Sequence, residues 1–438
     1  MATRYITLRW KSRASNLHCR RRARELAVEI DGFRREGSLM VSFLHTADLH
    51  LGLRLTRFPE HIVKKLQDAR FQAIERILHT ATQRHVDFLL IAGDLFDDHS
   101  IDARLARRAF EILASSPAPV FVISGNHDPL IPGGIWDREP WITADSGQVR
   151  FLRDRKPYEV QSGVVLYPCP VMCKTSREDP TAWIPTEEID ADCVRIGIAH
   201  GSYNCRPGLP ENDHLISENA PQSRKLDYLA LGHWHSRQVF PDQAGVTRVA
   251  YPGVHEPMRY QTSEDIRTGW TPYSDDPQRQ EFRDDGRGEI LHVTIDSPGA
   301  PPHVEAVEVG RLRWEQHLRE LQVEEDLSHL IAEVAADPAR EQRVLRLKVT
   351  GRLPAGAFAR LQELRDVLEA RYAYGELIDE DLQLTAEESE LRDIAGAGVT
   401  ARVFSRLREE TRDARREVRK PAEAALAALY QIATEGQA

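Results

Sequence analysis

Imidazole, carboxylate and amide side chains, the groups that bind divalent metal ions in proteins, gather at five points along the chain. Imidazole mixed with carboxylate suits manganese, iron or zinc, whereas sites made of oxygen alone suit magnesium or calcium. Two ions about 3.5–4 Å apart can hold both the attacking and the leaving oxygen of an in-line phosphoryl displacement. The chemistry open to this set is hydrolysis of a phosphate ester. Its members are Asp48, His50, Asp94, Asn126, His127, His200, His233 and His235.

The spacing inside these groups favours a shared pocket. Asp48 and His50 are two residues apart, as are His233 and His235, so each pair projects from one side of an extended segment. Asp94 could bridge two ions through its two carboxylate oxygens. A glycine directly precedes three of the groups, as expected where the backbone must turn tightly.

The segment Asn126-His127-Asp128 supplies three different roles. Asn126 would add a neutral ligand that keeps the site less negative toward a phosphodiester. His127 would face the scissile phosphate, where it could stabilise transition-state charge or protonate the leaving oxygen. Asp128 would orient an imidazole from behind the ligands. A metal-activated water would be the nucleophile, so the site requires no nucleophilic side chain.

Each group follows a short apolar run that is typical of a β-strand, with helical periodicity over 60–84 and 102–115 between the first runs. Ligands in open α/β sheets gather beyond the carboxyl ends of strands, so we expect these loops to converge. A single His or Gly-Asp is usually an ordinary core, surface or turn residue, and the indication comes from five groups in order. The strands are expected at 41–45, 86–91, 120–123, 194–199 and 228–231.

The alternation predicts an α/β protein with layered sheets, a smaller α/β unit and a helical C-terminal segment. The 438 residues divide into a basic extension at 1–39, a main domain at 40–310, a small unit at 311–385 and a charged helical segment at 386–438. The extension is more typical of an appendage than of an arm that binds nucleic acid. A polar stretch at 262–286 is expected to be a long loop or insertion.

Composition excludes several classes of protein. No apolar run reaches the roughly 18 residues of a membrane span, and no secretory signal is recognisable, so we expect a soluble cytoplasmic protein. The five cysteines are odd in number and form no C-x-x-C pair, which argues against a disulfide framework or a thiolate zinc site. The net charge of −10 argues mildly against nucleic acid, although two bound cations would add four positive charges where a phosphate must lie.

The ordered motifs DLH (48–50), GDLFDD (93–98), GNHD (125–128), AHGS (199–202) and GHWH (232–235) resemble the calcineurin-like metallophosphoesterase superfamily. The longer stretch LHTADLHLG (44–52), with YPG (251–253) and HEP (255–257), resembles the SbcD-type DNA repair nucleases in that superfamily. The resemblance covers about residues 41–310. It implies an α/β/β/α sandwich, a cap domain at 311–385 and a helical partner-binding segment at 386–438.

The resemblance also implies manganese as the metal, 3′-to-5′ exonuclease and endonuclease activity on DNA, a homodimer, and a coiled-coil ABC ATPase of the SbcC type as partner. His127 would be the catalytic histidine. Some members have a second histidine where this chain has Asp97, and His99 lies nearby in sequence. One ion would be held by Asp48, His50, Asp94 and His235, and the other by Asp94, Asn126, His200 and His233.

Two alternatives stay open. The first is a phosphodiesterase or phosphatase of the same fold that acts on small molecules, although a small substrate needs neither a cap nor a charged tail. The second is a non-catalytic assembly subunit, against which the complete ligand set argues. Arg54, Arg57 and Arg206 could face DNA, but each is more typical of a solvated surface charge.

Overall fold

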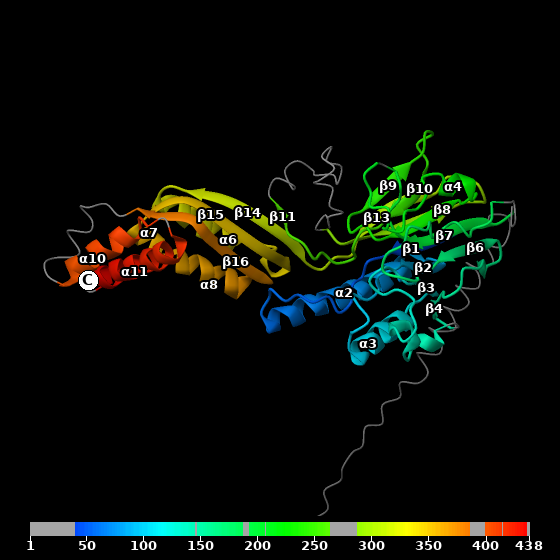
Figure 1. The fold of residues 1–438 in the computed structure, drawn as a ribbon, viewed down its shortest axis with the longest axis horizontal. Helices are drawn as coiled ribbons and strands as arrows, with labels where there is room; N and C mark the ends of the chain where they lie inside the picture. The colour runs from blue at the N-terminus through cyan, green and yellow to red at the C-terminus, as the bar shows by residue number, and fades with distance from the viewer. Residues whose placement is uncertain are drawn as a thin grey trace, which may run out of the picture.

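The structure is a computed structural model that describes residues 40–144, 147–186, 192–205, 207–262, 287–385, 399–413 and 415–435. The basic extension at 1–39, Arg206 and nearly all of the expected insertion lie outside the described residues. Figure 1 shows an elongated molecule, with a larger unit of two sheets at one end and a smaller sheet covered by helices at the other.

The first sheet of the larger unit has the strand order β13-β12-β1-β2-β3-β4. Strands β1 to β4 run parallel, while β12 and β13 pair in the antiparallel sense. Helices α2 (Glu60–Arg84) and α3 (Ala103–Ala114) bury their apolar faces against its outer side. The strands are β1 (Val41–Thr46), β2 (Phe88–Ala92), β3 (Val120–Ile123), β4 (Val149–Phe151), β12 (Glu289–Ile295) and β13 (His303–Glu308).

The second sheet has the order β5-β6-β7-β8-β10-β9. Its inner face packs on the first sheet through a shared apolar core, to which Phe43 and Phe88 contribute a stacked pair 5.0 Å apart. Its outer face is covered by loops and the one-turn helix α4 (Ala220–Ser223). The strands are β5 (Tyr158–Gln161), β6 (Val164–Cys169), β7 (Val194–His200), β8 (Tyr228–Gly232), β9 (Gln238–Pro241) and β10 (Thr247–Tyr251). Short 3-10 helices lie at Ile135–Asp137 and Trp141–Thr143.

The smaller unit is a four-stranded sheet in the order β11-β14-β15-β16, all parallel. Helices cover one side of it and enclose a separate apolar core. Its strands are β11 (Gln261–Thr262), β14 (Arg313–Leu321), β15 (Arg343–Pro354) and β16 (Tyr374–Thr385). Its helices are α6 (Glu324–Ala336), α7 (Ala355–Ala359), α8 (Leu361–Arg371), α10 (Val399–Glu410) and α11 (Arg416–Glu435), with a 3-10 turn at Arg340–Gln342.

The layered α/β prediction is confirmed for the larger unit, although its second outer layer is mostly loop. In the small unit, the helices α7 and α8 meet at Arg360. Strand β14 and helix α6 are not among the predicted elements, although Leu327, Leu330 and Val334 of α6 have helical spacing and are buried. Strand β11 precedes β12 in the chain yet pairs with β14, so the small unit is not the contiguous segment that was expected.

The C-terminal helices pack on the small unit instead of standing apart from it. Phe404 of α10 and Leu426 of α11 lie in its apolar core, and Lys420 donates to two carbonyls near the end of β16. Cys169 is a buried thiol and Cys173 an exposed one. Among the described helices, none has the length and hydrophobicity to cross a bilayer.

Candidate metal centre

The carboxyl ends of β1, β2, β3, β7 and β8 meet at one edge of the sandwich, and their loops bind one another through the backbone. Asp48 N–H donates to the Gly93 carbonyl at 3.1 Å, and His50 N–H donates to the Asp94 carbonyl at 3.0 Å. Three of these loop residues have left-handed φ values: 55° at Asp48, 42° at His50 and 52° at Asp94. Such conformations are uncommon outside glycine and concentrate at functional sites. The backbone of these loops therefore adopts an unfavourable conformation where it carries the side chains of the site.

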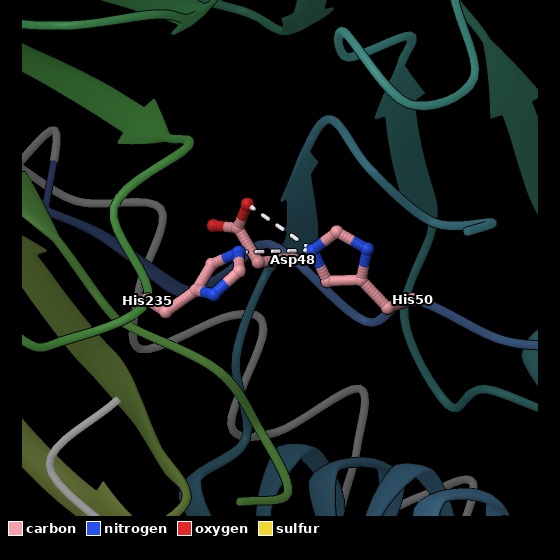
Figure 2. A group of neighbouring side chains, drawn as sticks. All are labelled: Asp48, His50 and His235. Atoms are coloured by element: carbon pink, nitrogen blue, oxygen red, sulfur yellow. Dashed lines mark hydrogen bonds and ion pairs between the residues drawn. The ribbon is translucent and has the colours of Figure 1, made fainter. Parts of the chain in front are cut away.

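The first group of predicted ligands is Asp48, His50 and His235, whose side chains face one another in Figure 2. The Nε2 atoms of the two imidazoles are 3.0 Å apart, and His50 Nε2 lies 4.0 Å from an oxygen of Asp48. Asp48 is fully buried and accepts the backbone N–H of His233 at 3.0 Å, which connects this group to the next one.

The second group is Asp94, Asn126, His200 and His233. His200 Nε2 lies 2.7 Å from Asn126 Oδ1 and 3.3 Å from Asp94 Oδ2. His233 Nδ1 lies 3.0 Å from the same amide oxygen. Asp94 also lies 3.8 Å from His50 Nε2, so its carboxylate stands between the two groups. The structure thus brings all seven predicted ligands together.

The tautomers of these histidines test whether the site fits cations. The Ala92 carbonyl, 2.9 Å from His200 Nδ1, can only accept, so in the neutral ring Nδ1 carries the hydrogen and Nε2 keeps a lone pair. That lone pair meets the oxygens of Asn126 and Asp94, which are acceptors as well. Acceptors at this distance repel one another unless a proton or a cation lies between them. The donor set and its geometry therefore fit a bound divalent ion.

Buried charge explains the pKa values at this site. Burial alone would lower the pKa of His200, but the charge of Asp94 and its hydrogen bond outweigh this effect and raise the pKa to about 9. Burial would raise the pKa of Asp94, yet the charges of His200 and His50 hold it well below its usual range. Burial, together with the charge of His50, lowers the pKa of His235. Protons on histidine thus supply positive charge that bound cations would otherwise bring.

His127 is the exposed member of the site, with 40% of its side chain accessible, and its ring lies 4.7 Å from that of His50. Its backbone N–H donates to Asp94 at 2.8 Å, and its Nδ1 donates to the Asp97 carbonyl at 3.0 Å. The Asp97 carboxylate lies 3.3 Å from His50 Nδ1. Asp97 therefore contacts both a predicted ligand, His50, and His127.

One expectation near this loop needs correction. Asp128 was expected to orient an imidazole, but its oxygens accept the backbone N–H groups of Gly125 at 2.7 Å and Phe96 at 3.0 Å, so it holds the two ligand loops together instead. Burial and the neighbouring Asp94 raise its pKa to about 7. His99 accepts the backbone N–H of Ile135 at 3.1 Å and so anchors an outer loop rather than the site.

Sequence reasoning missed two supporting residues. Arg70 of α2 is buried and donates twice to the Leu49 carbonyl, between two predicted ligands, and once to the Glu256 carbonyl. A charged residue on the apolar face of a helix was the signal that could have found it. Asp213, on the loop between β7 and β8, lies 3.1 Å from His233 Nε2. A loop aspartate carries no such signal.

The arginines proposed to face DNA have other contacts in the structure. Arg54 is exposed, lies 3.3 Å from Asp98 and donates to Ser100 at 2.6 Å. Arg57 lies over the rings of Phe58, Tyr260 and Trp314 at the junction of the two units. Arg206 lies outside the described residues.

Comparison with known proteins agrees with this geometry. Residues 41–237 match the Calcineurin-like phosphoesterase family. The chain is 31% identical over 221 residues to the uncharacterized metallophosphoesterase YhaO of Bacillus subtilis. It is 27% identical over 230 residues to the DNA double-strand break repair protein Mre11 of Methanocaldococcus jannaschii, and 24% identical over 265 residues to one of the subunits of the nuclease SbcCD of Escherichia coli.

These similarities are partial on both sides. They cover 49%, 51% and 50% of this chain, and 52%, 59% and 61% of the three relatives, in the order named. The chain therefore spans a little more than half the length of these curated relatives.

Proposed function

We propose that this chain is a two-metal phosphodiesterase that hydrolyses DNA in the cytoplasm, with manganese as its metal and both 3′-to-5′ exonuclease and endonuclease activity. The observation that carries the proposal is the convergence of acceptor atoms at Asn126 and Asp94, beside the exposed ring of His127. The printed names of the Mre11 and SbcCD relatives support DNA as the substrate class.

The roles of the ligands follow from the two groups. Two divalent ions held there would offset the negative charge of the phosphate. They would also lower the pKa of a water molecule, so that its hydroxide form is available as the nucleophile near neutral pH. Asp94 stands between the groups and would serve both ions. Asp48, His50 and His235 would complete one set, and Asn126, His200 and His233 the other.

His127 would act on the leaving group. The Asp97 carbonyl fixes the hydrogen of its ring on Nδ1, so Nε2 is the nitrogen available to substrate. A protonated Nε2 can stabilise charge on the phosphate or hand a proton to the departing sugar oxygen. Its exposure leaves room for a phosphodiester too large to enter a closed pocket.

The partners follow from the same resemblance. We propose a homodimer that works with a coiled-coil ABC ATPase of the SbcC type, because the Escherichia coli relative is named as a component of SbcCD. The inner faces of α10 and α11 are occupied by the small unit, so the ATPase would bind their outer faces, where Val403 of α10 is exposed. Residues 386–438 would then serve both to complete the cap and to bind the partner.

The net charge of −10 favours a second candidate, a phosphodiesterase of small molecules. The test assays the metal-loaded full chain with Mn²⁺ on three substrates: 3′-labelled duplex DNA, a closed DNA hairpin and bis-p-nitrophenyl phosphate. The DNA proposal expects release of nucleotides from the duplex and opening of the hairpin. Turnover of the small ester with intact DNA would favour the second candidate, and no turnover of any substrate would contradict both.

A further inference from the structure

A line of hydrogen bonds approaches the second ligand group from the side opposite the ligands. It contains three residues outside the predicted ligand set: Trp234, Ser202 and Asp213. Trp234 is fully buried, Ser202 is fully buried, and the Asp213 side chain is 25% exposed. The line ends on His233, one of the predicted ligands.

The direction of each hydrogen bond in this line follows from its chemistry. The indole N–H of Trp234 can only donate, so it donates to Ser202 Oγ at 3.0 Å. The hydroxyl hydrogen of Ser202 is then directed to Asp213 Oδ2 at 2.5 Å. Both carboxylate oxygens lie 3.1 Å from His233 Nε2. Because a carboxylate accepts, Nε2 carries the hydrogen, and Nδ1 is the nitrogen that presents a lone pair.

The backbone holds this carboxylate in place. Ser202 N–H donates to the Asp213 carbonyl at 3.2 Å, and the loop of Asp213 forms a bridge to Ser176. Gly201 makes the close approach possible, because a Cβ at that position would lie 2.3 Å from the His214 carbonyl oxygen. Gly201 and Ser202 of the AHGS motif thus both help to hold Asp213, eleven residues beyond Ser202, against His233.

We propose that Asp213 is a positioning residue that sets the tautomer and orientation of His233, so that Nδ1 faces the ion held with Asp94, Asn126 and His200. The inference rests on the proposed two-metal site. Carboxylates that accept the outer N–H of a ligating histidine typically change metal affinity by about 10–100-fold when they are removed. Asp213 contacts no ligand of the group formed by Asp48, His50 and His235 in the described contacts, so its effect is selective for one of the two ions.

The experiment measures metal binding rather than turnover. Mn²⁺ is titrated into the metal-stripped full chain by calorimetry, and the spin-coupled pair of ions is followed by electron paramagnetic resonance. The variants are Asp213→Ala, Asp213→Asn and Ser202→Ala. Glu211→Gln is the matched control, because it removes a charge from an exposed side chain of the same loop.

The parent should bind two ions. Asp213→Ala should keep one affinity and weaken the other by roughly 10–100-fold, with loss of the coupled signal. Asp213→Asn can still accept from Nε2 and should lose less, Ser202→Ala should weaken the same ion, and Glu211→Gln should match the parent. Two unchanged affinities in Asp213→Ala, or equal loss of both ions, would overturn the inference.

The variants also separate this inference from the proposed function. A parent chain that binds fewer than two ions contradicts the two-metal site itself, whatever the variants do. If Asp213→Ala does not fold by circular dichroism, Ser202→Ala and Asp213→Asn decide the question, since each retains most of the hydrogen-bonded line. Unchanged binding in both would overturn the role of Asp213 in that case.

Discussion

The two units of this molecule place their polar residues in opposite ways. In the larger unit, carboxylates and imidazoles such as Asp48, Asp94 and His200 are buried at strand ends, and several residues there have left-handed backbone conformations. In the small unit, charges form pairs on the open side of the sheet, as between Arg346 and Glu376 at 2.9 Å and between Lys348 and Asp381 at 2.7 Å. Among its described residues, only a glycine has a left-handed φ.

This difference indicates that the larger unit holds the chemical site, whereas the small unit is a scaffold. Left-handed non-glycine residues cost on the order of 1–3 kcal/mol each, and buried like charges cost more unless a counter-charge is present. The larger unit bears these costs at the site where cations would bind. The small unit has regular strands, solvated ion pairs and an apolar core, and so is suited to offer a surface. Changes in the metal and in pH should therefore affect the two units unequally.

The largest expected effect comes from Asp94→Ala. Asp94 stands between the ligand groups, so its removal should cost both ions and lower turnover by at least about 10³-fold. Metal analysis of the purified variant, together with the ester and DNA assays, measures this. The core of the small unit should stay folded, as read by hydrogen exchange in β15. Retention of two ions would show that Asp94 is not the bridge.

His127→Ala should separate metal binding from catalysis within the larger unit. The side chain of His127 is exposed and lies beyond the predicted ligands, so the variant should keep both ions but lose roughly 10²–10⁴-fold in turnover. His61→Ala, which changes an exposed histidine of α2, is the control and should match the parent. Equal turnover in His127→Ala and the parent would remove His127 from the mechanism.

The smallest effect concerns pH in the metal-free protein. Burial lowers the pKa of His45 from 6.5 to about 3, and burial, followed by the charge of Arg70, lowers the pKa of His255. At these two histidines the unfolded chain binds more protons, so their contribution to the stability of the larger unit is complete above pH 6.5 and is lost as pH falls toward 3. The raised pKa of His200 acts in the opposite sense. Glu315 of the small unit has a pKa below 4.5: burial would raise it, but His317 and Arg343 outweigh burial. The contribution of Glu315 therefore begins to fall only near pH 4.5.

Between pH 7.5 and 5.5, hydrogen exchange with EDTA should show that His45 and His255 lower the protection of β1 and β8 but not that of β15. The loss should reach about 1.4 kcal/mol per pH unit for each such histidine. His45→Gln should shrink it, because glutamine can keep the hydrogen bonds to Tyr228 and Leu231 without titrating. Equal loss of protection in both units would contradict the expectation that pH affects the two units unequally.

Local patterns of apolar residues predicted much of the fold. Strand β3 spans the predicted residues, and α2 spans the predicted periodic stretch, because apolar periodicity reports directly on a buried face. Strand β14 was missed because its apolar residues, Trp314, Leu318 and Leu321, do not alternate with polar ones, and Leu318 is itself 58% exposed. Strand β11 has two residues and depends on its partner β14, so no local pattern could place it in the small unit.

The sequence by itself determined which side chains could bind metal, because ligand types and the strands before them are local properties. The tertiary structure decided which of these side chains contact one another and which ring nitrogen of His200 and of His233 is an acceptor. It also decided that Asp128 accepts two backbone N–H groups and that Asp97 contacts His50. It also brought in Asp213 and Arg70. Those features depend on hydrogen bonds between loops distant in the chain, and such contacts exist only once two packed sheets have set the distances between strand ends.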